Sequence, residues 1–406
     1  MKKIQHFING KYVSNNCKAS TLVFNPATGE NISEVVSGNE NCIKDAVESA
    51  KAIFPKWSSE TPLSRSRKMF KLKEIIELRK DELAKLITLE HGKTFEDALG
   101  EVGRGLEVVE FACGIPSHLA GNFTSDVGTS VDSWSDYQPI GICAGITPFN
   151  FPVMVPLWMF PIAIACGNCF ILKPSERDPS STGLLVEMVH EAGIPPGVLN
   201  LVNGGKETVD AILRNEDIGS VSFVGSTPIA HYVYQEAAKY GKKVQAMGGA
   251  KNHMVVMPDA DMDLVTDSIM GSVFGSAGER CMAISVVVPV GKETGDTIRE
   301  KVIPKIENLK IGPGNDPSSE MGPLVTKEHL NKVTKYIDEG VKEGAELVVD
   351  GRNFNLQGYE NGYFVGGSFF DNVSTDMSIY KEEIFGPVMS MVRSKSLTEA
   401  LEMVNR

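Results

Sequence analysis

The sequence predicts an α/β protein built on a doubly wound, Rossmann-like sheet, and two observations support this fold class. First, short apolar strands alternate with helices from residue 140 onward, which implies parallel strands joined by right-handed crossovers. Second, the strands are apolar at consecutive positions, as expected of a sheet covered by helices on both faces. The predicted strands are 140–146, 169–172, 198–202, 221–224 and 243–247, and the predicted helices are 153–165, 182–192, 208–213 and 228–240.

The first 120 residues are predicted to be mostly helical after an initial hairpin. Asn9-Gly10 lies inside the apolar segment 5–13, and Asn-Gly favours the type I′ turn that joins two strands. Pro62 can begin a helix because its missing N–H costs nothing there. Apolar residues at helical spacing predict helices over 43–57, over 69–89 (one helix or two in succession) and over 94–118.

Residues 121–138 differ in composition from their neighbours. They are rich in Ser, Thr, Asp and Gly, and we expect an extended strand pair that reaches outside the main body and serves bridging or oligomerisation. We therefore expect a nucleotide-binding domain over 1–120 and 139–247 and a second, catalytic domain over 248–406. In the second domain the predicted strands are 253–257 and 285–290, and the predicted helices are 264–274, 294–309 and 327–343.

Composition places the chain among soluble globular proteins, with 406 residues, 42% hydrophobic and 23% charged. Its net charge of -12 disfavours a nucleic-acid surface and requires that an anionic substrate be held by local Arg or Lys. An uninterrupted apolar window of membrane-spanning length is absent from the sequence. Seven cysteines without a framework pattern predict a reduced, cytoplasmic protein as the simplest interpretation, with a processed mitochondrial form as the open alternative.

The segment 275–281, Gly-Ser-Ala-Gly-Glu-Arg-Cys, holds the strongest nucleophile candidate. Its small residues leave room for a substrate. Cys281 follows Arg280, whose charge favours the thiolate. The competing explanation, with about even weight on spacing alone, is a buried inert cysteine.

Polar residues follow the predicted strands where ligands bind in such sheets. Asn150, in the segment 147–152, could aim its amide at an oxyanion, or could stabilise a turn. Lys173 and Glu176 could bond sugar hydroxyls, or could belong to an exposed charged loop. Gly225 and Ser226 precede a helix, which favours a phosphate, although the pattern alone is weak.

Two further patterns favour ordinary structural roles. Cys166 and Cys169 form a CxxC, which could be a redox pair or half a zinc site, but no second CxxC exists and the segment is apolar. We therefore expect two buried cysteines and no metal site. His253 could act as a base, but a surface or core histidine is favoured.

Six motifs occur together along the chain: TPFNFP, KPSE, FVGST, MGGAKN, GERC and EEIFGP. In this order and spacing, over the whole chain, they resemble the aldehyde dehydrogenase superfamily. The stretches GSAGERCMAIS and MGGAKNH are similar to its CoA-acylating branch, which acts on anionic semialdehydes. The resemblance implies an NAD-dependent dehydrogenase with Cys281 as nucleophile, and Asn150 with the Cys281 backbone N–H as the oxyanion site.

One departure from the general family pattern concerns Ala246. Most members carry a Glu there, which activates water to hydrolyse the acyl-enzyme. Without that base, water is a poor nucleophile towards a thioester, whereas a thiol needs little help. The resemblance therefore implies transfer of the acyl group to coenzyme A, with loss of carbon dioxide when the substrate carries a carboxylate beta to the thioester.

The resemblance also implies ligand roles for individual residues. Arg280 and Arg104 are the two candidates for a substrate-carboxylate clamp. Lys173 and Glu176 would bind the adenosine ribose, and an acidic residue favours NAD over NADP, a preference that Arg177 could soften. Ser226 would contact the pyrophosphate, and Glu383 and Phe385 the nicotinamide ribose and ring. The remaining cofactor-binding residues expected are Thr147, Phe149, Gly225 and Gly248.

The chain ends at Arg406, which in this family pattern lies inside the catalytic domain, so we expect the C-terminal part of that domain to be missing. The full family pattern implies a homotetramer. Two other functions remain open from the sequence: a hydrolytic NAD-dependent aldehyde dehydrogenase that uses a different base, and a truncated, non-catalytic NAD-binding protein.

Overall fold

The computed structural model describes residues 2–14, 17 and 19–405. The chain forms two compact units. Unit 1 contains residues 1–23, 32–87 and 98–248, and unit 2 contains residues 24–31, 88–97 and 249–406. These units depart from the expected domain boundaries because 24–31 and 88–97 belong to unit 2. The second segment begins inside an uninterrupted helix, so no local sequence signal marks that boundary.

Unit 1 contains the predicted doubly wound sheet, with seven strands in the order β12-β11-β8-β9-β10-β2-β3. The five strands from β12 to β10 are parallel, and β2 and β3 are antiparallel additions at one edge. The parallel strands are β8 (Ile142–Ile146), β9 (Cys169–Lys173), β10 (Leu199–Leu201), β11 (Ile218–Val224) and β12 (Lys243–Met247).

Helices join these strands as the alternating pattern predicts. They are α5 (Met154–Ala165), α6 (Ser180–Glu191), α7 (Lys206–Arg214) and α8 (Thr227–Lys239). Every residue of β8 and β9 is buried, which confirms that the middle of this sheet is covered on both faces. By contrast, β12 alternates exposed and half-buried residues, as expected of an edge strand.

The N-terminal part of unit 1 begins with the predicted hairpin. Its strands are β2 (His6–Ile8) and β3 (Lys11–Val13), and Asn9 and Gly10 have φ values of 50° and 75°, as a type I′ turn requires. A three-stranded sheet that was not predicted joins β1 (Lys2–Ile4), β5 (Asn31–Val36) and β4 (Ser20–Phe24).

The three expected N-terminal helices are present, but the third ends earlier than predicted. Helix α1 spans Glu40–Ser58, and α2 is a single helix over Pro62–His91. The helix predicted over 94–118 is instead α3 (Phe95–Cys113) followed by a short α4 (Ile115–His118). The break falls at Gly114, two residues before Pro116, because proline cannot donate the hydrogen bond that a continuous helix needs.

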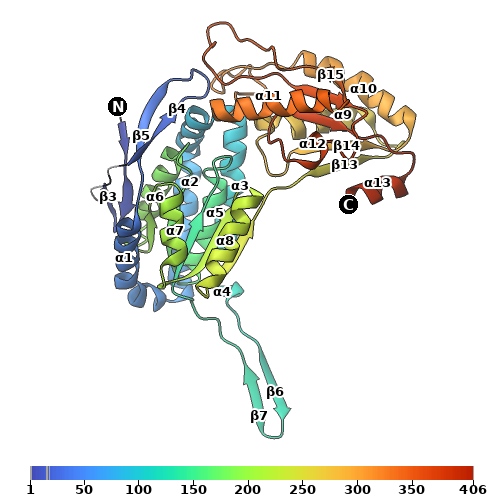
Figure 1. Cartoon of the computed structure of the whole chain (residues 1–406). Helices are drawn as coiled ribbons and strands as arrows, with labels where there is room; N and C mark the ends of the chain where they lie inside the picture. The colour runs from blue at the N-terminus through green and yellow to red at the C-terminus, as the bar shows by residue number, and fades with distance from the viewer. Residues whose placement is uncertain (1, 15–16, 18, 406) are drawn as a thin grey trace. The chain divides into compact units, whose positions relative to one another are not determined.

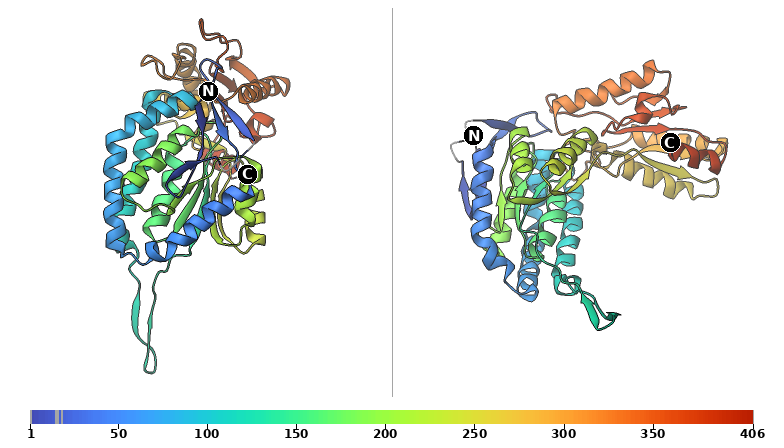
Figure 2. Two further views of the ribbon diagram at one scale, coloured as in Figure 1. Left: turned by 90° about the vertical axis from the view of Figure 1, so that its left-hand side faces the viewer. Right: turned by 60° about the horizontal axis from the view of Figure 1, so that its bottom comes forward.

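The polar segment at 121–138 forms a two-stranded ribbon of β6 (Phe123–Gly128) and β7 (Val131–Trp134). It extends away from the helices of unit 1 in every view (Figures 1 and 2). All ten strand residues are exposed, including the paired aromatic residues Phe123 and Trp134, which are 68% and 72% exposed. The strand pair predicted here is confirmed.

Unit 2 is built on a five-stranded sheet in the order β13-β14-β17-β16-β15, parallel except for the pair β15–β16. Its strands are β13 (Asn252–Val256), β14 (Ile284–Pro289), β15 (Glu346–Val349), β16 (Ser368–Asp371) and β17 (Val388–Met391). Its longer helices are α9 (Met262–Ile269), α10 (Lys292–Glu307), α11 (Lys327–Lys342) and α13 (Leu397–Val404), with a short α12 (Ser378–Lys381).

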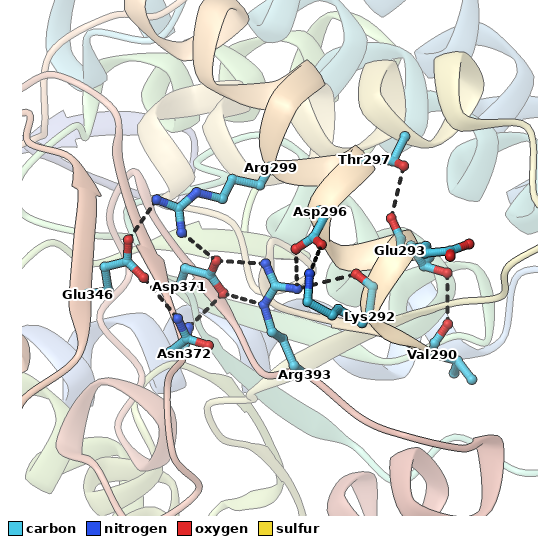
Figure 3. Close-up of polar contacts among 11 residues, drawn as sticks. Val290, Lys292, Glu293, Asp296, Thr297, Arg299, Glu346, Asp371, Asn372 and Arg393 are labelled. Carbon is cyan, nitrogen blue, oxygen red and sulfur yellow. Dashed lines mark hydrogen bonds and ion pairs between the residues drawn. The ribbon is translucent and has the colours of Figure 1, made fainter.

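A buried ionic network fixes the end of β16 (Figure 3). The fully buried carboxylate of Asp371 accepts hydrogen bonds from Arg299 on α10 and from both Nε and Nη2 of Arg393, each at 2.9 Å. Arg299 also pairs with Glu346 on β15. Burial by itself raises the pKa of Asp371, but Arg393, the Asn372 N–H and Arg299 outweigh it and hold this pKa below its usual value. Asp371 is therefore ionised and connects three elements of unit 2.

None of the helices within the described residues combines the length and the apolar character needed to cross a membrane.

Candidate active site

The segment that carries Cys281 has a strained backbone. It follows a one-turn π-helix (Met270–Phe274) and forms a short 3₁₀ turn (Gly275–Gly278). Ser276 and Ala277 both have a φ of 52°, in the left-handed region that costs a non-glycine residue roughly 1–2 kcal/mol. At Gly278, with φ 73°, a Cβ would lie 2.3 Å from the Gly386 carbonyl oxygen, so only glycine fits.

Asp97, in the first turn of α3, stabilises this turn. Its Oδ2 accepts a hydrogen bond of 3.0 Å from the Ser276 N–H, and its Oδ1 forms an ion pair of 2.5 Å with Arg280 Nη2. Arg280 Nη1 also donates to the Gly271 carbonyl, 3.2 Å away. A Cβ on Gly275 would lie 2.5 Å from that same Nη1. The small residue therefore makes room for Arg280, whereas the sequence suggested room for a substrate.

Cys281 lines a solvent-open pocket in unit 2 with about 340 Å³ of empty space, including its mouth. The pocket is also lined by Arg280, Asn252, Glu383 and Phe385. Asn252 Nδ2 donates to the Cys281 carbonyl at 2.8 Å, which fixes the backbone of the half-buried cysteine. The structure thus brings together four residues that the sequence nominated from two distant motifs: Arg280, Cys281, Glu383 and Phe385.

Lys251 and His329 hold the segment that carries Glu383 and Phe385. Lys251 Nζ donates to the carbonyls of Ile379 and Glu382 at 2.8 and 2.7 Å. Burial lowers the pKa of Lys251 to about 8, against the opposing effect of Glu383 and Glu382. His329 Nε2 lies 2.6 Å from the carbonyl oxygen of Phe385, and it must donate because a carbonyl only accepts. These bonds hold Phe385 at a φ of 59°.

Glu279 is a fully buried carboxylate two residues before the nucleophile. Its oxygens lie 3.9 Å from His91 Nε2 and 3.5 Å from His329 Nε2, and Oε1 accepts a hydrogen bond from the Val325 N–H at 3.3 Å. Burial, reinforced by Lys93, His329 and Arg280, lowers the pKa of His91 well below its usual value. His91 is therefore neutral and packs beside Glu279 without adding a charge.

Asp97, His91, Glu279, Lys251 and His329 were not nominated from the sequence. Two of them, Glu279 and Lys251, lie in the recognised motifs GERC and MGGAKN, and their charge beside small residues was the one available signal. Asp97 and His91 lie more than 180 residues before Cys281 and have no local pattern that points to this turn.

In unit 1, the nominated cofactor residues lie at the carboxyl ends of neighbouring parallel strands, where ligands bind in such sheets. After β8, the Thr147 N–H donates to the Lys173 carbonyl at 3.1 Å, and the Phe149 ring lies 4.9 Å from the Arg177 guanidinium carbon. After β9, Lys173 Nζ lies 3.2 Å from Glu176 Oε2.

The charge state of Glu176 follows from these neighbours. Burial raises the pKa of Glu176, but Lys173, a backbone N–H and Arg177 outweigh it, so that the pKa lies below its usual value. The pair Lys173–Glu176 therefore offers one ammonium donor and one ionised acceptor at the strand end.

Asn150 is buried in the turn between β8 and α5. The turn is fixed by Glu101 of α3, a fully buried carboxylate whose Oε1 accepts hydrogen bonds from the N–H groups of Val153 and Met154 at 2.8 and 3.1 Å. Glu101 was not nominated from the sequence. The Arg104 guanidinium, one helical turn along α3, lies 5.6 Å from the Phe151 ring centre. Arg104 therefore lies close to the turn that carries Asn150.

Gly225, Ser226 and Gly248 also lie together at this edge. Gly225 donates its N–H to the Met247 carbonyl at 3.1 Å, and Ser226 is the residue that precedes α8. A Cβ on Gly248 would lie 3.1 Å from Thr227 Oγ1. The small residues keep this helix start free of bulky side chains, which suits a phosphate.

The two minor candidates have structural roles. Cys166 and Cys169 are free thiols; Cys169 is buried as expected, whereas Cys166 is half-buried, and Cys169 Sγ donates weakly to the Ala50 carbonyl at 3.6 Å. His253 Nδ1 bonds the Lys251 carbonyl at 2.8 Å, and its Nε2 bonds the Tyr380 hydroxyl at 3.1 Å. Both ring nitrogens of His253 thus hold neighbouring segments of unit 2.

The fold and these motifs define the class of protein. The profile of the aldehyde dehydrogenase family matches residues 12–406, and the chain belongs to this family. It is 54% identical over 405 residues to a malonate-semialdehyde dehydrogenase of Pseudomonas aeruginosa. The alignment covers 100% of this chain and 81% of that protein.

Two solved structures are also similar to this chain. One is a protein of Sinorhizobium meliloti, provisionally assigned as a methylmalonate-semialdehyde dehydrogenase and crystallised with NAD. It matches with a TM-score of 0.98 and 54% identity, and the match covers 99% of this chain and 82% of that one. The other is a methylmalonate-semialdehyde dehydrogenase of Oceanimonas doudoroffii, with a TM-score of 0.98, 51% identity and coverage of 100% and 83%.

Proposed function

We propose that the protein oxidises malonate semialdehyde or methylmalonate semialdehyde with NAD and transfers the acyl group to coenzyme A. Its relatives named above support the substrate class. One observation supports acyl transfer over hydrolysis: Ala246 occupies the position of the usual water-activating Glu. In the described part of the pocket wall, Glu383 is the only carboxylate, and its Oε1 faces the Ala250 N–H at 3.4 Å.

The chain's own residues suit the first half of this reaction. The Cys281 thiolate attacks the aldehyde carbon and forms a tetrahedral alkoxide. Asn150 and the Cys281 backbone N–H are proposed to donate to that oxygen. A bound NAD would supply the hydride acceptor for this alkoxide, and loss of the hydride would leave a thioester on Cys281. Lys173 and the ionised Glu176 fit the hydroxyls of its adenosine ribose, and the start of α8 at Ser226 fits its pyrophosphate.

The second half releases the product. With a carboxylate beta to the thioester, the carbon–carbon bond breaks, carbon dioxide leaves and the thioester carbonyl takes up the electron pair, which is then protonated. The thiol of coenzyme A attacks the remaining acyl group and releases the Cys281 thiolate. The products are acetyl-CoA from malonate semialdehyde and propanoyl-CoA from methylmalonate semialdehyde.

Arg104 is the favoured substrate-carboxylate clamp in this proposal. In the described chain no carboxylate lies within ion-pair distance of Arg104, whereas Arg280 already pairs with Asp97. Two parallel N–H donors of a free guanidinium match a carboxylate. Arg280 then has mainly a positioning role, through the turn that it shares with Asp97.

The deciding experiment measures NADH formation from malonate semialdehyde with and without coenzyme A. Many turnovers that require coenzyme A, with acetyl-CoA as product, are expected. Multiple turnovers without coenzyme A would instead establish the hydrolytic alternative. A burst of one turnover under both conditions would retain the Cys281 chemistry and refute acyl transfer. Binding of NAD without any NADH formation would support the non-catalytic alternative.

The exposed ribbon of β6 and β7 supports a further part of the proposal, assembly into a homotetramer. An isolated two-stranded ribbon is marginally stable in water, and its exposed aromatic residues would gain from burial against another copy. Deleting residues 123–134 should shift the sedimentation of the protein towards the monomer. If the deletion variant sedimented as the same oligomer as the wild type, this role would be contradicted. The free cysteines favour residence in the reducing cytoplasm.

A further inference from the structure

Three side chains of unit 1 that the proposed reaction does not use lie close together. They are His6 on β2, Cys17 between β3 and β4, and Cys42 in the first turn of α1, and their ligand-type atoms all lie within 4.8 Å of one another. Cys17 Sγ is 3.4 Å from His6 Nε2 and 3.2 Å from Cys42 Sγ. His6 and Cys42 are buried, whereas Cys17 is half-buried and can meet a small solute.

The tautomer of His6 can be assigned from its second nitrogen. The Asn203 backbone N–H donates to His6 Nδ1 at 3.1 Å. Because a backbone N–H can only donate, Nδ1 carries a lone pair. Burial lowers the pKa of His6 to about 4, so the ring is neutral at physiological pH and its single proton is on Nε2. His6 Nε2–H therefore donates to the sulfur of Cys17.

This proton argues against a metal site. A ligating imidazole binds through a lone pair and usually donates with its other nitrogen, whereas here Nδ1 accepts and Nε2 holds the proton. Two thiolates at about 2.3 Å from one tetrahedral zinc ion would also stand about 3.8 Å apart, further than the observed 3.2 Å between the sulfurs. The two sulfurs are only about 1.2 Å further apart than in a disulfide bond, whose length is about 2.05 Å. Their separation therefore suits a disulfide pair better than a zinc site.

We infer that Cys17 and Cys42 are a reversible disulfide pair that a hydroperoxide oxidises, with His6 as the hydrogen-bond donor to the attacking sulfur. The Cys17 thiolate attacks the outer peroxide oxygen; the O–O bond breaks, and the leaving oxygen takes up a proton as water or an alcohol. Cys17 is then a sulfenic acid. The Cys42 sulfur attacks Cys17, the S–O bond breaks, and hydroxide leaves with the Cys42 proton as water. Two thiols lose two electrons and the peroxide gains them.

The surroundings set the speed of this reaction. Burial raises the pKa of Cys17 to about 12, Cys42 and Glu207 add to the rise, and Lys3 opposes it. The thiolate is consequently a minor species at neutral pH, and its oxidation is slow. The N–H of His6 favours the charged sulfur and so increases its share.

The bond would constrain a defined part of the chain. Cys17 and Cys42 are 25 residues apart, and the segment between them includes residues 24–31, which belong to unit 2. The first point at which the chain leaves unit 1, after residue 23, and the point at which it returns, at residue 32, both lie inside the closed loop. The disulfide removes conformations from the unfolded chain and is expected to raise the midpoint of thermal unfolding by a few degrees, on the order of 2–8 °C.

The test treats the reduced full-length protein with hydrogen peroxide and maps the cysteine-containing peptides by mass spectrometry. A peptide that links Cys17 to Cys42 and disappears with dithiothreitol is expected. His6→Asn, which retains an acceptor for the Asn203 N–H but loses the donor to Cys17, should slow linkage roughly tenfold. His6→Gln, which extends an amide N–H towards Cys17, should restore part of that rate, and Cys113→Ser is the matched control with an unchanged rate.

Three outcomes would overturn the proposal. Cys17 could be oxidised to a sulfinic acid without any linked peptide. Linkage at equal rates in wild type and His6→Asn would remove the assigned role of His6. Retention of one zinc ion by the reduced protein, lost in Cys17→Ser and measured by native mass spectrometry, would replace the disulfide pair with a metal site. The wild-type measurements do not depend on whether a variant folds.

Discussion

The site residues of unit 1 and those of unit 2 are held in place by different means. In unit 1, Lys173 is the last residue of β9, and Glu176 and Ser226 lie just beyond the ends of β9 and β11, so the sheet backbone sets their positions. In unit 2, Cys281 follows a strained turn, and the half-buried carboxylate of Asp97, from a distant segment, holds that turn through Ser276 and Arg280. The comparison indicates that unit 1 should tolerate changes around its ligand residues, whereas unit 2 should lose activity when a supporting side chain is removed.

The largest expected effect comes from Cys281→Ala. Because the nucleophile is lost, the rate of NADH formation should fall on the order of 10⁴-fold or more, or about 5.5 kcal/mol. The dissociation constant of NAD, measured by fluorescence titration, should stay within about twofold of wild type if unit 1 binds the cofactor. Cys166→Ser, a matched thiol substitution in unit 1, should retain wild-type turnover. Equal loss of binding and turnover would contradict the separation of roles.

The next effect concerns the ionic network of unit 2. Asp371→Asn leaves two arginines with a weakened partner and should lower the free energy of unfolding of unit 2 by roughly 3 kcal/mol. Denaturant titration should show an earlier transition for unit 2 and an unchanged one for unit 1. Asp376→Asn, whose exposed carboxylate lies 3.9 Å from Lys381, is the control and should change stability by about 0.5 kcal/mol or less.

The effect of Asp371 should also depend on pH. Because its pKa is lower in the folded than in the unfolded chain, its contribution is complete above the unfolded value of about 3.9. The contribution is lost as the pH falls through the folded value. The stability difference between wild type and Asp371→Asn should therefore be constant near neutral pH and shrink below about pH 4. A difference that grows on acidification would be inconsistent with an ionised Asp371.

A smaller effect is expected from Asp97→Asn. The amide cannot balance the charge of Arg280, so the turn at Ser276 and Ala277 loses part of its support, and turnover should fall roughly 10- to 100-fold, about 1.4–2.7 kcal/mol. Alkylation of Cys281 by iodoacetamide should slow in parallel, and Asp97→Glu should restore part of both rates. Asp267→Asn, in an exposed pair with Lys305, should leave both rates near wild type. Normal alkylation with low turnover would argue against a positioning role.

The smallest effect concerns cofactor choice in unit 1. Glu176→Gln removes the charge that repels a 2′-phosphate and should raise the ratio of NADP to NAD efficiency about tenfold, or about 1.4 kcal/mol. Steady-state kinetics with each cofactor measure the ratio. Glu191→Gln, on the surface of unit 1 and paired with Arg79, should not change it. An unchanged ratio in Glu176→Gln would mean that Arg177 or the backbone sets the preference.

The sequence predicted the sheet of unit 1 well because its elements have local signals. The turn at Asn9-Gly10 and the continuous apolar runs of β8 and β9 are each visible within a few residues. The strands β15, β16 and β17 were not predicted. Each has only four residues, which is too short for a period to show, and long connections separate them.

The supporting residues of unit 2 were beyond local reasoning for a physical reason. Asp97 reads as an ordinary acidic residue in the first turn of a helix, and His91 as the last residue of the preceding one. Their importance arises from contacts with residues 276–280, which tertiary structure alone creates. The sequence analysis could nominate Cys281, Glu383 and Phe385 together because their motifs occur together in one family. That co-occurrence indicates that the residues belong to one site, which the spacing of residues along this chain does not show.

The division of the chain between the units has a consequence for its synthesis. The segment 88–97 contributes Asp97 and His91 to unit 2, but the rest of that unit, apart from residues 24–31, begins only at residue 249. A ribosome that adds roughly 5–20 residues per second needs roughly 8–30 s to bridge that interval. During this time unit 1 can fold, whereas the segment 88–97, whose Glu90 and Lys93 are buried in the folded protein, lacks most of unit 2. The nascent chain is thus a candidate client for chaperones until residues 249–406 emerge.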